Sequence, residues 1–422
     1  MTLTGFLVTI ETIMNKRARN VIFLIFLGLF LISAPIVVLY TAGFRINSQR
    51  MTLVKTGLFS LSSEPKGANI FIDNTDTKQK TNTVIKNIMP GEHVISFVKT
   101  GYLPWEKKLE VKENETSFVQ KAELFLDSES TVKIDTEYSV YALDTNGEKI
   151  AFALSTEGWL EIWFKLLSSG EEKLLLRLPK TDFETISLSW SLFDKETLII
   201  KETKNSQIVW RSVKQNGESE TLSDNPFLTW KRDENQFLFI KETVGQTNLV
   251  NRNQNEQETI LAIIPSGQYE FLPAPPSFVL LHDQNRNKIL LIDDRGVDQP
   301  ILLNTSALSV AWNPQNKKQL LYASDFELHI FDAENLTDEL LTRLSVSISG
   351  AAWHTSGQDI FFTDNKNLFA VELDNRGGQR QIWTLAAFEK IETFATTENG
   401  KTIYLFGTKD DNTGLFERKL VE

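Results

Sequence analysis

The sequence contains no cysteine, which excludes disulfide bonds, thiolate nucleophiles and cysteine-ligated zinc. Histidine is also scarce: His93, His282, His329 and His354 lie far apart in the chain and lack the spacing of a metal-binding motif. We therefore expect ordinary surface or strand histidines, no metal site and no cofactor.

Signatures of catalysis are also missing. We find no glycine-rich phosphate loop, no G-x-S-x-G turn, no H-E-x-x-H helix and no calcium-binding EF-hand loop. The stretches "SSG" (168–170) and "PSG" (265–267) are typical of turns between strands, and acidic pairs such as Asp293-Asp294 and Asp410-Asp411 usually cap exposed turns. The sequence thus predicts no catalytic residues and a protein that is not an enzyme.

Excess positive charge is absent too. The formal net charge of the 422-residue chain is −11. A nucleic-acid-binding protein needs a basic surface to contact phosphates, so we expect no nucleic-acid partner. The length allows two or three domains with well-buried cores.

An uncharged apolar segment, "VIFLIFLGLFLISAPIVVLY" (21–40), predicts a transmembrane helix over residues 21–42. A twenty-residue helix is roughly 30 Å long, which matches the hydrocarbon core of a bilayer. A cleaved signal peptide is the alternative, with Lys16, Arg17 and Arg19 as its basic region. However, the run is longer than the usual signal core, and Pro35 would directly follow the candidate cleavage site.

The basic cluster also predicts the orientation, because positive residues usually stay in the cytoplasm. Residues 1–20 would then be cytoplasmic and nearly the whole remaining chain extracytoplasmic. Arg45, Arg50 and Lys55 on the other flank weaken this signal. The segment "MNKRAR" from Met14 resembles the start of an anchor, so we expect Met14 rather than Met1 to begin the natural protein.

A small antiparallel β domain is predicted over residues 53–126. The strand "ANIFID" alternates in polarity, a polar loop follows, and a Pro-Gly turn precedes the alternating strand "HVISFV". The stretches "GYLPWEKKLEV" and "SFVQKAELFL" supply two more strands. Several spaced residues of this module resemble the PEGA domain family; they are Pro65, Gly67, Ala68, Asp73, Pro90, Gly91, Gly101, Tyr102 and Trp105.

The module departs from the PEGA pattern at Asn74, where glycine is common, and at Thr83-Val84, where Thr-Pro is usual. Both departures lie in the predicted loop and leave the fold unaffected. The resemblance implies a small extracytoplasmic β-sandwich that often links an anchor to a larger envelope domain. It implies no catalytic chemistry.

The rest of the chain repeats. An aromatic residue followed by a turn and an apolar strand recurs at intervals of 49, 40, 41, 41, 41 and 41 residues, at Tyr141, Trp190, Trp230, Phe271, Trp312, Trp353 and Phe394. Further strands follow in most repeats. Four strands per unit at a period near forty residues predict a β-propeller of seven blades over residues 128–422. The aromatics then have a structural role as wedges between blades.

The repeat turns, such as "DTNGEK" and "HTSGQD", resemble degenerate TolB-type propeller repeats, which implies the fold rather than a function. The last repeat lacks a fourth strand. Since a propeller cannot leave that edge unpaired, we expect "STVKID" (130–135) to pair beside "GLFERKL". The extra residues of the first interval should lie in loops around "STEGW" and "LPKTDFE".

The predicted fold class is therefore all-β apart from one N-terminal transmembrane helix, with a PEGA-type β-sandwich before a seven-bladed propeller. The predicted function is that of a single-pass, membrane-anchored, extracytoplasmic scaffold, whose propeller binds a protein or a cell-envelope partner of unknown identity. The alternative is a carbohydrate or cell-wall-polymer binding module, with Trp105 or Trp159 as an exposed stacking platform.

Overall fold

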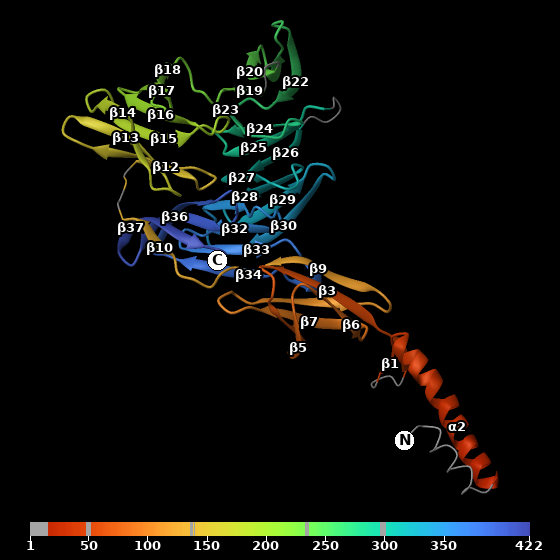
Figure 1. The fold of residues 1–422 in the computed structure, drawn as a ribbon. Coiled ribbons are helices and arrows are strands. Elements are labelled where there is room, and N and C mark those ends of the chain that lie inside the picture. The colour runs from red at the N-terminus through yellow and green to blue at the C-terminus, as the bar shows by residue number, and fades with distance from the viewer. Residues whose placement is uncertain (1–15, 48–51, 136–137, 139, 233–235, 296–300) are drawn as a thin grey trace. The chain divides into compact units, whose positions relative to one another are not determined.

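The computed structural model describes residues 16–47, 52–135, 138, 140–232, 236–295 and 301–422 (Figure 1). Residues 1–15, which include Met14 and most of the predicted cytoplasmic segment, lie outside the described residues. Two compact units can be distinguished. The first comprises Met1–Thr100, Pro104–Leu124 and Arg376–Gly378, and the second comprises Gly101–Leu103, Phe125–Asn375 and Gln379–Glu422.

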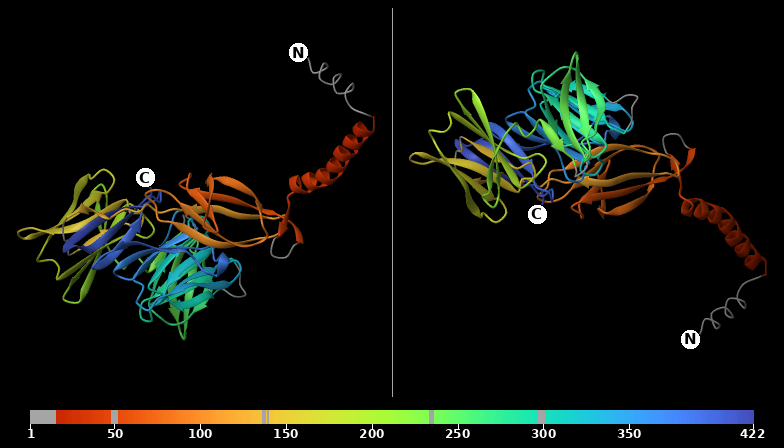
Figure 2. Two further views of the ribbon diagram at one scale, coloured as in Figure 1. Left: turned by 90° about the horizontal axis from the view of Figure 1, so that it is seen from below. Right: turned by 90° about the horizontal axis from the view of Figure 1, so that it is seen from above.

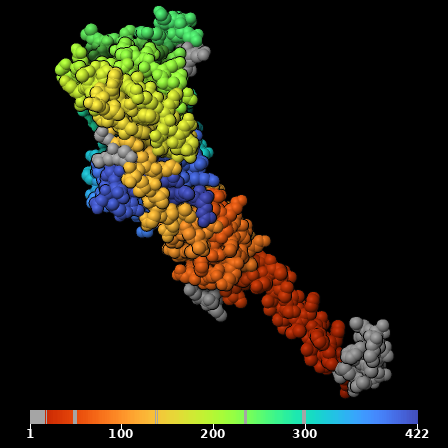
Figure 3. All heavy atoms as spheres, turned by 60° about the vertical axis from the view of Figure 1, so that its left-hand side comes forward, coloured from red at the N-terminus to blue at the C-terminus, as the bar shows by residue number. Residues whose placement is uncertain are grey.

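The only helix longer than one turn in the described part of the chain is α2 (Lys16–Thr41). Its stretch Arg19–Thr41 is long and apolar enough to cross a membrane, and none of its most apolar part is buried by the described residues. Figures 1 and 3 show this helix in red. The hairpin of β1 (Phe44–Asn47) and β2 (Thr52–Lys55) follows. The Arg45 guanidinium lies over the Tyr40 ring and donates to the Tyr40 carbonyl, 2.8 Å away, so it caps the helix end.

The small β domain consists of two sheets, with the strand orders β6–β3–β9 and β5–β4–β7–β8. The bounds are β3 (Gly57–Glu64), β4 (Asn69–Ile72), β5 (Thr75–Lys80), β6 (Thr83–Ile88), β7 (Gly91–Val98), β8 (Trp105–Val111) and β9 (Thr116–Glu123). Its core is apolar and includes Phe59, Ile70, Ile95 and Phe97.

Two expectations for this domain were wrong. The predicted polar loop contains strand β5, which pairs with β4. The domain is not purely antiparallel either, because β3 and β9 run parallel. These two strands are far apart in the sequence, and alternation of polarity along a strand does not reveal which strand lies beside it or in which direction.

The second unit contains seven four-stranded sheets, which we number as blades 1–7 (Figures 1 and 2). Blade 1 has β11 (Tyr141–Leu143), β12 (Lys149–Ser155), β13 (Trp159–Leu166) and β14 (Glu172–Pro179); blade 2 has β15 (Thr185–Trp190), β16 (Thr197–Lys204), β17 (Gln207–Lys214) and β18 (Ser219–Leu222); blade 3 has β19 (Thr229–Lys231), β20 (Phe237–Thr243), β21 (Gln246–Arg252) and β22 (Glu258–Ile264). Blade 4 has β23 (Tyr269–Leu272), β24 (Phe278–Asp283), β25 (Lys288–Asp293) and β26 (Ile301–Ser306); blade 5 has β27 (Ser309–Trp312), β28 (Gln319–Ala323), β29 (Glu327–Asp332) and β30 (Thr337–Arg343). Blade 6 has β31 (Gly350–Trp353), β32 (Asp359–Thr363), β33 (Asn367–Glu372) and β34 (Ile382–Ala387), and blade 7 has β35 (Lys390–Thr396), β36 (Thr402–Lys409), β37 (Asn412–Lys419) and β10 (Thr131–Ile134). A 3-10 turn, η1, covers Arg376–Gly378.

Blade 7 joins the two ends of the domain. Strand β10 precedes blade 1 in the sequence but pairs antiparallel with β37, with Thr131 opposite Glu417 and Val132 opposite Phe416. This confirms the predicted pairing of residues 130–135 with the last repeat. The edge of β37, which would otherwise present unpaired backbone groups, is thereby covered.

One part of the extra length of the first repeat interval lies in a strand. Strand β14 of blade 1 has eight residues, whereas the corresponding strands of blades 2–6 have four to seven. A hairpin can lengthen in this way without disturbing the repeat, because each added residue pairs with the neighbouring strand β13.

Apolar clusters join neighbouring blades. Shared clusters link blades 1 and 2, 3 and 4, 4 and 5, 5 and 6, and 7 and 1. Blades 2 and 3 meet through aromatic pairs, in which Phe193 stacks on Trp230 and Trp210 packs edge-on against Phe227.

Candidate binding site on the propeller

The PEGA-type motif residues have structural contacts. Asp73, at the β4–β5 turn, has a positive φ of 50° and accepts hydrogen bonds from the Val94 N–H (2.9 Å) and from His93 Nδ1 (2.6 Å). Burial alone would raise the pKa of Asp73, but these hydrogen bonds and the His93 charge outweigh it, so the pKa is lowered. The contacts fix the turn against β7.

The glycines of the motif occupy turns. Gly67, Gly91 and Gly101 have φ values of 85°, 141° and 79°, which other residues rarely adopt. Pro90 directly precedes β7, and Ala68 is fully buried. Pro65 accepts a hydrogen bond from the Ser63 hydroxyl through its carbonyl oxygen.

Two aromatic residues of the motif are buried. Trp105 is 1% exposed and stacks on Phe97, with ring centroids 4.7 Å apart. It is therefore not the exposed stacking platform that the carbohydrate hypothesis considered. Tyr102 pairs with Leu126 in an isolated bridge, and its hydroxyl accepts a hydrogen bond from the Glu422 N–H at 3.4 Å.

Three tryptophans of the propeller repeats make the same hydrogen bond. The indole nitrogens of Trp190, Trp312 and Trp353 donate to a backbone carbonyl of the preceding blade at 2.9, 3.0 and 3.0 Å. The acceptors are Ala142, Pro273 and Ala311, in that order.

The other repeat aromatics differ in detail. Tyr141 stacks on Phe406 and donates to Glu392 at 2.8 Å. Burial, followed by the Glu392 hydrogen bond, raises the pKa of the Tyr141 hydroxyl. Phe271 is fully buried in the cluster between blades 3 and 4. Trp230 belongs to the same cluster and also stacks on Phe193 of blade 2. Phe394 is half-buried.

A hollow of about 740 Å³ lies along the first strands of blades 5, 6 and 7 and the β11–β12 turn of blade 1. We call it the inner hollow. Its walls are made largely of small residues, including Ser309, Ala311, Gly350, Ala351 and Ala352. The sequence analysis did not identify this site. The available signal was the run of small residues in "SGAAW" before Trp353 and in "SVAW" before Trp312.

The carboxylates of the inner hollow are already paired. Glu398 accepts hydrogen bonds from Lys195 Nζ (2.6 Å) and Asn146 Nδ2 (3.1 Å), which raises the pKa of Lys195. Glu392 accepts one from Lys390 Nζ (2.6 Å), and this bond is the main reason why the pKa of Glu392 is lowered. These carboxylates therefore bring little net charge into the hollow.

Thr363 at the end of β32 and Thr396 at the end of β35, which are 2% and 8% exposed, belong to the lining of the inner hollow. Their hydroxyl oxygens are closed off from the hollow and have no hydrogen-bond partner among the described residues. An unsatisfied buried hydroxyl is unfavourable, so each such group calls for an explanation. The half-buried rings of Trp312 and Phe394 line the same hollow.

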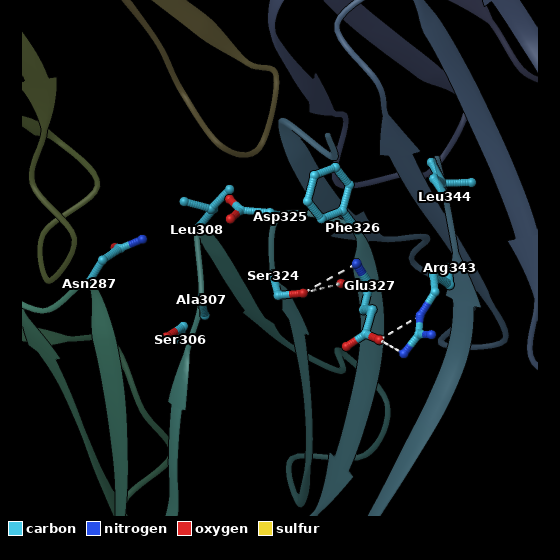
Figure 4. Close-up of a pocket in the computed structure, with 10 residues that line it drawn as sticks. All are labelled: Asn287, Ser306, Ala307, Leu308, Ser324, Asp325, Phe326, Glu327, Arg343 and Leu344. Carbon is cyan, nitrogen blue, oxygen red and sulfur yellow. Dashed lines mark hydrogen bonds and ion pairs between the residues drawn. The ribbon is translucent and has the colours of Figure 1, made fainter. Parts of the chain in front are cut away.

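A second, smaller hollow of about 430 Å³ lies between blades 4 and 5 (Figure 4). Glu327 and Arg343 face each other on neighbouring strands and form an ion pair there, while the Ser324 hydroxyl accepts a hydrogen bond from the Glu327 N–H at 3.2 Å. Leu308 and Phe326, both 48% exposed, line the same hollow. The combination of exposed apolar side chains and a polar wall is typical of a contact site.

Among the described residues, no group of three or more His, Asp or Glu side chains is arranged to hold a metal ion. Of the two tryptophans that the carbohydrate hypothesis named, Trp159 remains exposed, at 45%. The described residues thus form an apolar helix, a two-sheet β domain and a seven-bladed propeller that carries hollows.

Comparison with known proteins identifies the small β domain. The family model of the PEGA domain matches residues 56–139. No curated protein sequence matches the chain. Among solved structures, a chain of the mitotic checkpoint complex is similar at 13% identity, a TM-score of 0.46, and coverage of 70% of this chain and 91% of that one. Oligogalacturonate lyase in complex with manganese is similar at 13% identity, a TM-score of 0.44, and coverage of 79% and 94%.

Proposed function

We propose that this protein is a membrane-anchored, extracytoplasmic binding protein whose propeller holds a protein or a polymer of the cell envelope. The observation that carries the binding role is the inner hollow. Its volume lies within the range of roughly 300–1,000 Å³ that is usual for ligand pockets, and polar groups converge on it from three blades and a turn of a fourth.

The uncovered apolar helix supports the anchor. A helix of this length that served as a core element of a soluble protein would be covered on at least one side, but none of the most apolar part of Arg19–Thr41 is buried by the described residues. A cleaved signal peptide passes the same test of length and composition. The basic residues Arg17 and Arg19 on the N-terminal flank of the helix favour a cytoplasmic location of the chain's N-terminus. The PEGA match supports the extracytoplasmic side, as the family resemblance implies.

A non-catalytic role fits the sequence, which contains no glycine-rich phosphate loop, no G-x-S-x-G turn and no H-E-x-x-H helix. Propellers serve enzymes and binding proteins alike, so the fold alone does not decide this point. The exposed Trp159 on β13 favours carbohydrate binding as the second candidate function, since an aromatic face on a strand can stack on a sugar ring.

Photo-crosslinking in the native host tests the main proposal. The crosslinking residue p-benzoylphenylalanine would replace Gln315, which is exposed beside the inner hollow, or Phe326 in the second hollow. The control position is Glu157, in the exposed β12–β13 turn. We expect envelope material to be captured at Gln315 or Phe326 and not at Glu157. Capture of cytoplasmic proteins alone, or equal capture at all three positions, would overturn the proposal.

A further inference from the structure

We propose that the hairpin of β1 and β2 is a second membrane contact, which lies in the headgroup layer beside α2 and binds the phosphates of anionic phospholipids. The inference rests on the membrane anchor of the proposed function and goes beyond it, because a transmembrane helix stays in a bilayer without a further contact. Three features of the hairpin support it, namely its position, its exposed apolar face and its charge.

The hairpin begins where the helix leaves the membrane. The candidate span Arg19–Thr41 has 23 residues, which gives roughly 34 Å of helix, slightly more than the roughly 30 Å of a hydrocarbon core. Tyr40 then lies at the membrane–water interface, where tyrosine rings are commonly found. Strand β1 starts shortly afterwards, at Phe44, so the hairpin begins within the headgroup layer.

Several contacts fix the hairpin at the end of the helix. The Arg45 guanidinium lies 3.7 Å from the centroid of the Tyr40 ring and donates to the Tyr40 carbonyl. At the base of the hairpin, the Gly43 carbonyl accepts hydrogen bonds from the Thr56 N–H (2.9 Å) and the Thr56 hydroxyl (2.8 Å). The hairpin is therefore held next to the last helical turn and is not carried on a free linker.

One face of the hairpin is apolar and uncovered. The register pairs Phe44 with Lys55 and Ile46 with Leu53, so these four side chains share a face. Ile46 is 71% exposed and Leu53 is 50% exposed. The exposed fraction of Ile46 exceeds that of every large apolar side chain of α2, all of which would lie in lipid.

This apolar face is turned away from the helix. Arg45 lies on the opposite face of β1, and its contact with Tyr40 places that opposite face against the helix end. Lipid surrounds a membrane-spanning helix, so a face that turns away from the helix at this level meets headgroups and the ends of acyl chains. An isolated two-stranded sheet is only marginally stable in water, and cover by lipid would stabilise this one.

The charge of the hairpin selects anionic headgroups. Its sequence, "FRINSQRMTLVK" (44–55), contains Arg45, Arg50 and Lys55 and no acidic residue, in a chain whose net charge is −11. Basic residues close to an anionic membrane surface strengthen binding to it. Lys55 shares the apolar face, so its stem can lie on lipid while its ammonium group reaches a phosphate. An acidic protein could match the charge, but continuity with the anchor favours the lipid.

Electron paramagnetic resonance of the full chain in nanodiscs of phosphatidylcholine and phosphatidylglycerol tests the contact. The chain has no native cysteine, so a nitroxide can be attached to Ile46→Cys or Leu53→Cys on the apolar face. Thr52→Cys, exposed on the opposite face, is the matched control. Oxygen concentrates in lipid, whereas a nickel chelate stays in water. We expect collisions with oxygen to dominate at Ile46→Cys and Leu53→Cys, and collisions with nickel at Thr52→Cys.

Dominance of nickel at all three positions would place the hairpin in water and overturn the inference. Protection of Ile46→Cys and Leu53→Cys from both reagents would overturn it too, because protein would then cover this face. A nitroxide at Ile32→Cys, within the helix, separates this failure from that of the anchor. Oxygen at Ile32→Cys alone leaves the anchor standing, whereas nickel there refutes the anchor as well.

The phosphate contact has its own test. We expect the preference for oxygen at Leu53→Cys to fall in nanodiscs of phosphatidylcholine alone. In the mixed lipid, Lys55→Gln should reproduce this fall, and Lys86→Gln, at an exposed lysine of β6, should not. A preference for oxygen that depends neither on phosphatidylglycerol nor on Lys55 would overturn the binding of anionic phosphates.

Discussion

The indole nitrogen of Trp353 donates a hydrogen bond of 3.0 Å to the backbone carbonyl of Ala311 and so joins the first strands of blades 6 and 5. Trp190 and Trp312 repeat this bond at their own junctions. The aromatic residue of the repeat therefore contributes more than apolar bulk. It satisfies a carbonyl on the edge of the preceding blade, where no further strand pairs.

We predict that Trp353→Phe lowers the free energy of unfolding by about 1–2 kcal/mol, since it keeps an aromatic ring but leaves the Ala311 carbonyl without its donor. Urea unfolding measures the change. Trp159→Phe is the matched control, because Trp159 is exposed and should change stability by less than about 0.5 kcal/mol. Equal effects of the two substitutions would contradict a specific role for the hydrogen bond.

The pairing of β10 with β37 can be trapped covalently. Thr131 and Glu417 lie directly opposite each other, and the chain has no native cysteine to interfere. We predict that Thr131→Cys with Glu417→Cys forms a disulfide on oxidation, seen as a mobility shift on a non-reducing gel. The control pair, Thr131→Cys with Lys419→Cys, is displaced by two residues, which puts the Cα atoms roughly 7–8 Å apart and too far for a bridge. A bridge in the control alone would show a different register.

The sequence predicted the blades because each blade is a local unit. A period of about forty residues, a leading aromatic and a turn recur within one stretch of chain, and a missing fourth strand leaves one place for residues 130–135. The parallel pairing of β3 with β9 could not be predicted in the same way, since it depends on a contact between distant segments.

The inner hollow could not be predicted for the same reason. Its charge balance depends on Lys195 of blade 2 and Glu398 of blade 7, two residues 203 positions apart that meet only in the folded domain. Its volume depends on small residues on three strands, each of which is unremarkable alone. For Trp105 the sequence left two interpretations open. The family motif indicated a structural residue, whereas a tryptophan could also form an exposed stacking platform; the side chain is in fact buried.

Arg418 is predicted to be the charged residue whose loss costs most stability in blade 7. It is 1% exposed, and this burial lowers the pKa of its guanidinium. The guanidinium donates hydrogen bonds to the carbonyls of Leu385 (2.8 Å) and Leu126 (2.7 Å). Arg418→Met leaves these acceptors unpaired and should lower the free energy of unfolding by about 2–4 kcal/mol. Urea unfolding of Arg343→Met, where the side chain is exposed, should show a loss of at most about 1 kcal/mol.

The Asp73–His93 contact predicts a specific pH dependence of the small β domain. The pKa of Asp73 is lowered in the folded state, so its contribution to stability is fully present above the unfolded value, near 3.9, and is lost as the pH falls through the folded value. Asp73→Asn should therefore destabilise the domain at pH 7, and its difference from the wild type should shrink as the pH falls toward 2. Fluorine NMR of 5-fluorotryptophan at Trp105, in the same domain, measures its unfolding at each pH. An equal loss at both pH values would show that the charge is not involved.

Selective labelling tests the orientation across the membrane, again with the help of a cysteine-free chain. Glu157→Cys lies in an exposed turn of blade 1, and Asn15→Cys lies directly before the basic cluster. A basic flank is usually retained in the cytoplasm. We therefore expect a membrane-impermeant maleimide to label Glu157→Cys in intact spheroplasts, and Asn15→Cys only after lysis. Labelling of Asn15→Cys alone before lysis would reverse the orientation. Recovery of the labelled Glu157→Cys protein in the soluble fraction, without residues 16–41, would replace the anchor with a cleaved signal peptide.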